Sequence, residues 1–129
     1  MNITVVFTNQ KEKQLQKNFR GTEMACKDGT QEYMYSEWLM DVLQQIRDYF
    51  NAPVTINSGY RTGNWNEKVG GAKNSYHTKG MAADIVVKGH SSKEVAKVAS
   101  ELLGEFGGVI RYTNFTHVDV RPKKYRKGV

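Results

Sequence analysis

Apolar residues recur at helical spacing in the stretch that follows Ser36. A serine suits the N-cap position, because its hydroxyl can accept a hydrogen bond from an amide of the first turn. The residues on the apolar face are Leu39, Met40, Leu43, Ile46, Tyr49 and Phe50. The opposite face is polar, and Asn51-Ala52-Pro53 stops the pattern. The sequence therefore predicts an amphipathic helix whose apolar face belongs to the core.

A second helix is predicted after Ser91. Ser91 and Glu94 stand three residues apart and match the capping-box pattern, in which each side chain bonds to the other residue's backbone. The apolar positions that follow are Val95, Val98, Ala99, Leu102 and Leu103. Gly104 ends this helix.

Short runs of β-branched and apolar residues predict strands around these two helices. The runs cover residues 1–7, 54–57, 81–87, 109–112 and 115–120. Residues 8–35 show no sustained period, and we expect irregular structure there with a helical piece around residues 11–17. Residues 58–80 form a long loop region with a short helix around residues 64–69. This order predicts an α+β fold, with helices packed on one face of a small mixed or antiparallel sheet.

The composition narrows the chemistry that such a domain can perform. The chain has 129 residues and a single cysteine, Cys26. One cysteine excludes an intramolecular disulfide and a multi-cysteine zinc cluster, so any metal site must use histidines and carboxylates. The length favours one domain over residues 1–129. Cys26 is expected to be a free structural cysteine.

The charge is basic, with 19 Lys and Arg against 13 Asp and Glu, a net charge of +6. A basic surface favours polyanionic partners, which include nucleic acid, anionic lipid and an acidic cell-wall polymer. The densest basic cluster, residues 123–127, lies in a segment, 122–129, that we expect to be a solvated tail. No apolar run is long enough to span a bilayer. The N-terminal apolar stretch lacks a basic region and a cleavage site, so we expect cytoplasmic synthesis without a signal peptide.

Two histidines and one aspartate are the candidate metal ligands. His77 lies in the long loop region, Asp84 lies among apolar residues of a predicted strand, and His117 lies in the last strand. Strand alternation places His117 and Asp119 on one face and two valines on the other. Two histidines and a carboxylate leave an open position on tetrahedral zinc, as a hydrolase requires. The same residues could instead be hydrogen-bonded polar positions or charge partners, and spacing alone leaves both readings open.

The segment Ser75-Tyr76-His77-Thr78-Lys79-Gly80-Met81-Ala82-Ala83-Asp84 resembles the Ser-x-His-x-x-Gly-x-Ala-x-Asp signature of a known family. This family comprises the zinc D-alanyl-D-alanine carboxypeptidases and related peptidoglycan-cleaving metallopeptidases. Upstream residues 58–72 resemble the family's approach to this signature, and downstream residues 107–121 resemble the closing strand of the compact branch that includes phage lysins. The resemblance covers about residues 19–126, nearly the whole chain. It implies a hedgehog/D-Ala-D-Ala-peptidase-like fold and a single zinc peptidase domain.

The resemblance implies that His77, Asp84 and His117 bind one zinc ion. It also implies that Arg61 lies near the scissile bond, where a guanidinium can hold a substrate carboxylate or a developing oxyanion. Several branches carry a Glu or Asp three residues before the third ligand, but this chain has Asn114 there. We therefore expect Asp119 to act as the general base, or else to orient His117 or Arg61.

The substrate groove is expected to include Arg61, Ser75, Tyr76 and Tyr112. Ser75 is also expected to hydrogen-bond within the ligand loop, and Gly80 to adopt a backbone conformation closed to larger residues. Tyr60 and Trp65 are equally compatible with the groove and with packing. His90 matches no ligand position and is expected in a surface loop.

The predicted function is zinc-dependent hydrolysis of peptide bonds in peptidoglycan stem peptides or cross-links, by a monomer. The resemblance to the compact branch also suggests a phage or prophage lysin that acts on the cell wall. Two alternatives stay open. One is an inactive zinc-stabilised wall-binding module, because Asn114 stands where several branches carry a carboxylate. The other is a basic nucleic-acid-binding domain, which the charge alone suggests.

Overall fold

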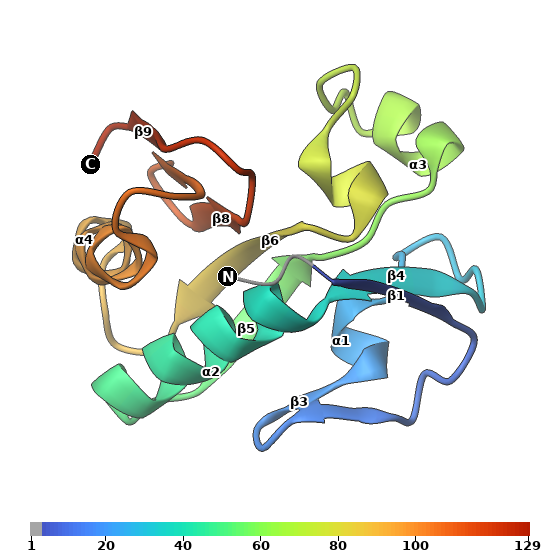
Figure 1. Cartoon of the computed structure of the whole chain (residues 1–129), viewed down its shortest axis with the longest axis horizontal. Coiled ribbons are helices and arrows are strands. Elements are labelled where there is room, and N and C mark those ends of the chain that lie inside the picture. Colours follow the sequence, from blue (N-terminus) through green and yellow to red (C-terminus); the bar gives the residue numbers. More distant parts are fainter. Residues whose placement is uncertain (1–3) are drawn as a thin grey trace.

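A mixed five-stranded sheet lies at the centre of the computed structural model, which describes residues 4–129 (Figure 1). Its strands are β5 (Val54–Ser58), β6 (Ala82–Val87), β7 (Gly108–Arg111), β8 (Thr116–Asp119) and β9 (Tyr125–Lys127). Their spatial order is β5-β6-β8-β7-β9. All neighbours are antiparallel except β7 and β9, which are parallel.

Two long helices, α2 (Glu37–Phe50) and α4 (Ser92–Leu103), pack on one face of this sheet and against each other (Figure 1). Both predicted caps are confirmed. The Ser36 hydroxyl accepts a hydrogen bond from the Leu39 amide at 3.2 Å. Ser91 and Glu94 form the reciprocal capping box, with N···O distances of 3.2 and 3.1 Å. The prediction of an α+β fold with helices on one face of a mixed sheet is confirmed.

The core lies between the helices and the sheet, and strand alternation decides which residues enter it. On β6, Ala83 and Ile85 are fully buried in this core, and on β8 so is Val118. The helix residues in the core include Leu39, Leu43, Ile46, Val95 and Ala99. Since adjacent strand residues face opposite sides, Asp84 and His117 lie on the face of the sheet away from the helices.

The N-terminal third contains more regular structure than its sequence suggested. β1 (Val5–Thr8) pairs with β4 (Tyr33–Ser36), β2 (Gln14–Gln16) pairs with β3 (Phe19–Arg20), and α1 (Gly21–Met24) follows β3. The predicted helical piece at residues 11–17 is wrong. Strands of two to four residues are too short to show a period, so only their pairing reveals them. The first residues of the strand predicted at 1–7 lie outside the described residues.

The long loop region carries two short helices, α3 (Gly63–Lys68) and the 3-10 helix η1 (Tyr76–Lys79). The helix predicted around residues 64–69 is therefore confirmed. Gly80 ends η1 with a φ of +71°, and a Cβ there would meet the Met34 backbone at 2.6 Å. The prediction that Gly80 needs a conformation closed to larger residues is confirmed.

The prediction that residues 122–129 form a solvated tail is wrong. Tyr125–Lys127 forms β9, and the Arg126 guanidinium donates to the Gly107 carbonyl at 2.6 Å and to the Ser100 hydroxyl at 2.8 Å. The run of basic residues therefore contains an edge strand that pairs with β7 and is hydrogen-bonded to α4. No helix among residues 4–129 is long and apolar enough to cross a membrane.

Candidate metal centre

The pairing of three strands places the candidate ligands next to one another. Asp84 on β6 lies directly opposite His117 on β8 and opposite Ser58 on β5. His77 comes from η1, which leads into β6. The Ser75 hydroxyl caps this helix by accepting a hydrogen bond from the His77 amide at 3.2 Å, which confirms its expected bond within the loop.

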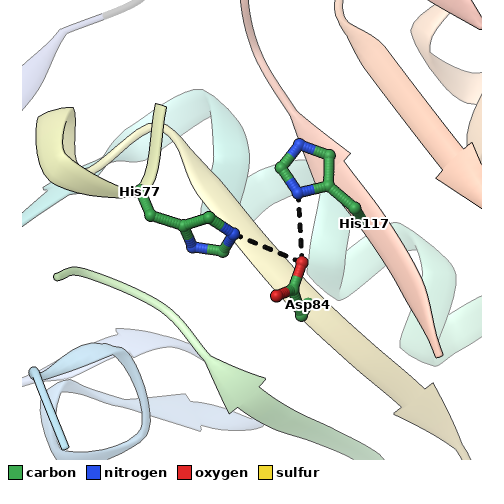
Figure 2. Close-up of side chains that lie close together, drawn as sticks. All are labelled: His77, Asp84 and His117. Atoms are coloured by element: carbon green, nitrogen blue, oxygen red, sulfur yellow. Dashed lines mark hydrogen bonds and ion pairs between the residues drawn. The ribbon is translucent and has the colours of Figure 1, made fainter. Parts of the chain in front are cut away.

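Three ligand atoms converge on one point (Figure 2). His77 Nε2 lies 3.3 Å from Asp84 Oδ1, and His117 Nδ1 lies 3.0 Å from the same oxygen. The three atoms all lie within 4.8 Å of one another, and all three residues are buried. A tetrahedral zinc ion with ligands at 2.0–2.1 Å separates them by about 3.3 Å. The spacing therefore suits a small divalent cation.

The second nitrogen of each imidazole also faces an acceptor. His77 Nδ1 lies 2.8 Å from the Gly59 carbonyl oxygen, and His117 Nε2 lies 2.8 Å from Asp119 Oδ2. A neutral imidazole has a single N–H, and these outer acceptors use it. Each inner nitrogen then points a lone pair at the Asp84 carboxylate. Either an extra proton on both rings or a cation between them must offset that repulsion, and a bound metal does so with one ion.

The pKa values reflect this concentration of opposite charge. Burial alone would raise the pKa of Asp84. In the alternative with the extra proton on both rings, the hydrogen bonds and charges of His117 and His77 hold that pKa well below its ordinary value. Burial by itself would lower the pKa of His117, but the hydrogen bonds and charges of Asp119 and Asp84 raise this pKa above its ordinary value. The site keeps its carboxylates ionised and favours positive charge between them.

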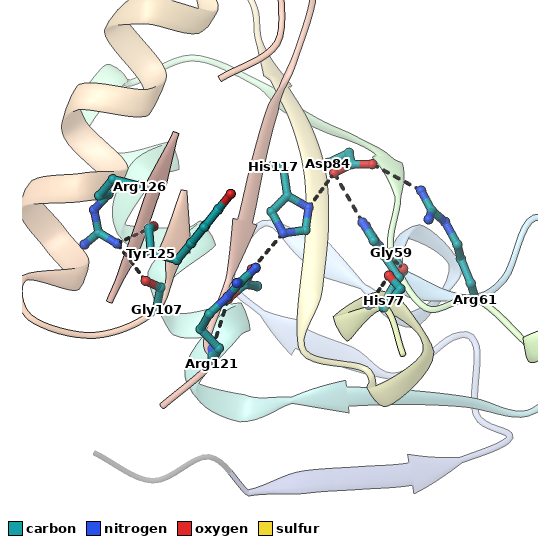
Figure 3. A network of polar contacts seen from close by, with 11 residues as sticks. Gly59, Arg61, His77, Asp84, Gly107, His117, Arg121, Tyr125 and Arg126 are labelled. Atoms are coloured by element: carbon teal, nitrogen blue, oxygen red, sulfur yellow. Dashed lines mark hydrogen bonds and ion pairs between the residues drawn. The ribbon is translucent and has the colours of Figure 1, made fainter. Parts of the chain in front are cut away.

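Asp119 lies on the side of the His117 ring away from Asp84, because it contacts Nε2 whereas Asp84 contacts Nδ1. Figure 3 shows His117 between Asp84 and Arg121. Asp119 is fully buried, and the Arg121 guanidinium grips it at 2.6 to 3.1 Å. Burial would raise the pKa of Asp119, but His117 and Arg121 hold it well below its ordinary value. The general-base role does not fit this geometry, because the carboxylate faces the nitrogen that points away from the ligand cluster. Its contacts fit the other expected role, that of orienting His117.

Arg61 contacts the opposite side of Asp84. Its Nη2 lies 3.4 Å from Asp84 Oδ2, while Nε donates to Ser58 at 3.0 Å and Nη1 to Asn66 at 3.1 Å. Arg61 therefore sits beside the ligand cluster, as expected.

A pocket of about 440 Å³ opens over the ligand atoms. All four residues expected in the groove line it, together with both histidines and Asp84. The lining residues that bear on the chemistry are Arg61, Ser75, Tyr76, His77, Asp84, Tyr112, His117 and Arg121. Tyr60 instead packs against the core, and Trp65 is absent from the pocket wall. His90 packs on Phe50 and lies 3.3 Å from Glu94, away from this pocket.

Asp84 is the single carboxylate residue among the described residues that line the pocket. Asn114 is exposed in the turn between β7 and β8 and does not line it. Within residues 4–129, no side chain of the pocket wall therefore replaces the carboxylate that several branches place at this position.

Sequence reasoning missed Arg121 as a site residue. His117, Asp119 and Arg121 alternate along the chain, and the pleat of an extended segment brings alternate side chains to one face. That signal was present in the sequence. The partner ring Tyr125 carried no such signal, because only the pairing of β9 with β7 brings it to Arg121.

Comparison with known proteins places the chain in a family. The model of the family described as Peptidase M15 matches residues 11–119. The chain belongs to the peptidase M15 family. This result confirms the resemblance to peptidoglycan-cleaving zinc peptidases.

Curated relatives include two proteins whose names state an activity. The peptidoglycan L,D-endopeptidase MepK of Escherichia coli K12 is 35% identical over 94 residues, which cover 67% of this chain and 52% of that protein. The zinc D-Ala-D-Ala carboxypeptidase of Streptomyces albus G is 37% identical over 71 residues, 51% of this chain and 27% of that protein. The chain thus matches about half of the MepK length.

Proposed function

We propose that this chain is a zinc-dependent peptidase that hydrolyses peptide bonds in bacterial peptidoglycan. One observation carries the proposal: His77 Nε2, Asp84 Oδ1 and His117 Nδ1 converge, while both outer ring nitrogens face acceptors. The donor set matches a catalytic zinc site with three protein ligands and an open position. Relatives named as peptidoglycan endopeptidase and zinc carboxypeptidase support the same chemistry.

The roles of individual residues follow from their contacts. His77, Asp84 and His117 would hold the ion, which would act as a Lewis acid on the scissile carbonyl and would lower the pKa of a bound water. The Gly59 carbonyl and Asp119 fix which nitrogen of each histidine is free to bind metal. Arg61 braces Asp84 and lies at the pocket wall, where its charge can stabilise negative charge on the substrate.

The test combines metal content with digestion of purified sacculi. The purified protein is expected to bind about one zinc ion, and the zinc-loaded form to release peptide fragments that mass analysis assigns to a cleaved bond. His77→Ala should lose both properties. His90→Ala, which removes a histidine outside the pocket, should retain both. A wild-type protein without zinc and without cleavage would overturn the proposal.

A second candidate rests on the absence of a free carboxylate among the described residues of the pocket wall. A zinc-stabilised module that binds the wall without cleaving it needs the three ligands but no general base. This candidate predicts zinc binding and sacculus binding without released fragments. Zinc-loaded protein that cleaves defined muropeptides would exclude it.

We infer one peptidase domain, acting as a monomer on the cell wall in the manner of phage or prophage lysins. The net charge of +6 and the exposed Lys123 and Lys124 support attraction to an anionic wall. Light scattering after gel filtration tests the monomer, and loss of sacculus binding on raising the salt concentration tests the attraction.

A further inference from the structure

Arg121 is held differently from Arg61, which also lines the pocket. Arg121 Nε and Nη2 bond to Asp119, at 2.8 and 2.6 Å. Its guanidinium carbon lies 4.7 Å from the Tyr76 ring centroid and 4.6 Å from that of Tyr125. Two aromatic faces and one carboxylate therefore fix the group in place.

One edge of this fixed guanidinium is left open. Among the described residues, no hydrogen bond of Arg121 uses Nη1, and the residue lines the pocket above the ligands. Arg61 differs, since each of its three nitrogens already donates to Ser58, Asn66 or Asp84. Arg121 thus presents an unused donor where a substrate would lie.

The charge around the pocket favours an anion at that donor. Asp84 offsets Arg61, and the buried Asp119 offsets Arg121. A divalent ion on the three ligands would then leave the pocket with excess positive charge, since its described wall contains no other carboxylate. An anionic group on the substrate can neutralise part of this excess.

We propose that Arg121 is a specificity-determining residue that binds a substrate carboxylate through Nη1. The substrate class is a peptide with a free carboxylate close to the scissile bond, either at the chain terminus or on a diacid side chain. This inference rests on the proposed peptidase function and deepens it. The Tyr76–Arg121–Tyr125 stack makes the site rigid, so little side-chain entropy is lost on binding.

Two matched pairs of synthetic stem peptides test this proposal. In one pair the C-terminal group is a carboxylate or a carboxamide, and in the other the diacid side chain is a carboxylate or a carboxamide. Zinc-loaded wild type should prefer the acid of at least one pair by about ten- to a hundredfold in kcat/KM, since a charged hydrogen bond is lost in the amide. The pair that shows the preference identifies which carboxylate Arg121 binds.

Arg121→Lys should reduce this preference to about one, because a single ammonium cannot bond to Asp119 and to the substrate as a planar fork does. A purely structural role predicts a different result: acid and amide would slow equally and the preference would persist, which would overturn the proposal. Arg111→Lys, an exposed arginine on β7, is the matched control and should keep the wild-type preference.

A second variant covers the case in which Arg121→Lys fails to fold or to bind zinc. Tyr125→Leu removes one face of the stack and keeps the Asp119 pair, so the acid preference should weaken, whereas Tyr125→Phe should retain it. A zinc-loaded wild type that cleaves acid and amide equally overturns this inference alone. If the wild type cleaves none of the peptides, the proposed function fails. The Arg121 inference is then tested by calorimetry: tighter binding of the acid than of the amide in at least one pair supports it, and equal affinities in both pairs overturn it.

Discussion

The two arginines of the pocket hold their aspartates in different ways. Arg61 contacts Asp84 through one nitrogen at 3.4 Å, and its other nitrogens bond to Ser58 on β5 and Asn66 on α3. Arg121 grips Asp119 through two nitrogens at 2.6 to 3.1 Å. Asp84 keeps an oxygen for the ligand cluster, whereas both oxygens of Asp119 are used by its neighbours. The loosely held carboxylate is thus suited to bind a metal, and the tightly held one is suited to orient a ligand.

The backbone beneath the two arginines shows the same contrast. A Cβ on Gly71 would meet the Asn66 side chain and, at 2.9 Å, Arg61 Nη1. A Cβ on Gly108 would meet the Asp119 carboxylate and, at 2.7 Å, Arg121 Nε. Gly71 lies in the loop before η1, but Gly108 pairs with Asp119 inside the sheet. The Asp119 and Arg121 side chains therefore have less room to move away from a new side chain than Asn66 and Arg61 have.

The largest effect is expected from Asp84→Asn. Loss of the ligand charge leaves two neutral imidazoles to bind the ion, so zinc affinity should fall by more than about a hundredfold and hydrolysis should be lost. Atomic absorption of the dialysed protein measures the first and muropeptide digestion the second. Asp41→Asn, on the exposed face of α2, is the matched control. Full zinc content in the Asp84 variant would show that Asp84 is no ligand.

A smaller effect is expected from Asp119→Asn. The amide keeps the shape but weakens the hydrogen bond to His117 and the pairing with Arg121, so zinc affinity should fall about 10- to 100-fold. Competition with a chromophoric chelator measures it. A general base would behave differently: zinc affinity would be unchanged and only kcat would fall. That result would contradict the positioning role.

The two glycines provide the next test. Gly108→Ala should lower the free energy of unfolding by about 1–3 kcal/mol, because Asp119 is buried between strands and cannot yield. Gly71→Ala should lower the free energy of unfolding by less, because the new Cβ meets the end of the Asn66 side chain, and this amide can rotate away from it. Gly63→Ala, where a Cβ meets nothing within 4 Å, is the control and should stay within about 0.5 kcal/mol of wild type. Urea denaturation of metal-free protein gives the three values, and equal losses at residues 71 and 108 would contradict the contrast.

The smallest effect is expected at Asp28. Its Oδ2 accepts a hydrogen bond from the Thr62 hydroxyl at 2.9 Å, and this bond stabilises the start of α3, on the Arg61 side of the pocket. Hydrogen bonds from Thr30 hold the pKa of Asp28 well below its ordinary value. A pKa lowered by folding stabilises the fold above the unfolded pKa of about 4, and this contribution is lost as the pH falls further. Asp28→Asn should therefore destabilise by less than about 1 kcal/mol near pH 7 and by less still below pH 4, as measured by urea denaturation. A difference independent of pH would contradict this account.

The sequence predicted much of the site because its signals are local. The spacing of His77 and Asp84 is fixed by one short segment, and the pleat of a strand relates His117 to Asp119. Capping residues likewise marked both long helices at Ser36 and Ser91. Patterns of this kind can be recognised in the sequence without knowledge of contacts between distant residues.

Other features depend on contacts that no local pattern encodes. Which nitrogen of His117 faces Asp119 is decided by the packing of β6 against β8, so the choice between base and positioning roles stayed open. The basic C-terminal segment forms β9 because it pairs with β7. The short strands around Gln14 and Phe19 exist only as partners of each other.

The most direct test of the account is anomalous diffraction at the zinc edge from crystals of the zinc-loaded protein. We expect one zinc peak within about 2.0–2.2 Å of His77 Nε2, a carboxylate oxygen of Asp84 and His117 Nδ1, with His117 Nε2 still bonded to Asp119. A zinc ion bound elsewhere, or bound through His117 Nε2 with Asp119 as a neighbour of the ion, would contradict it.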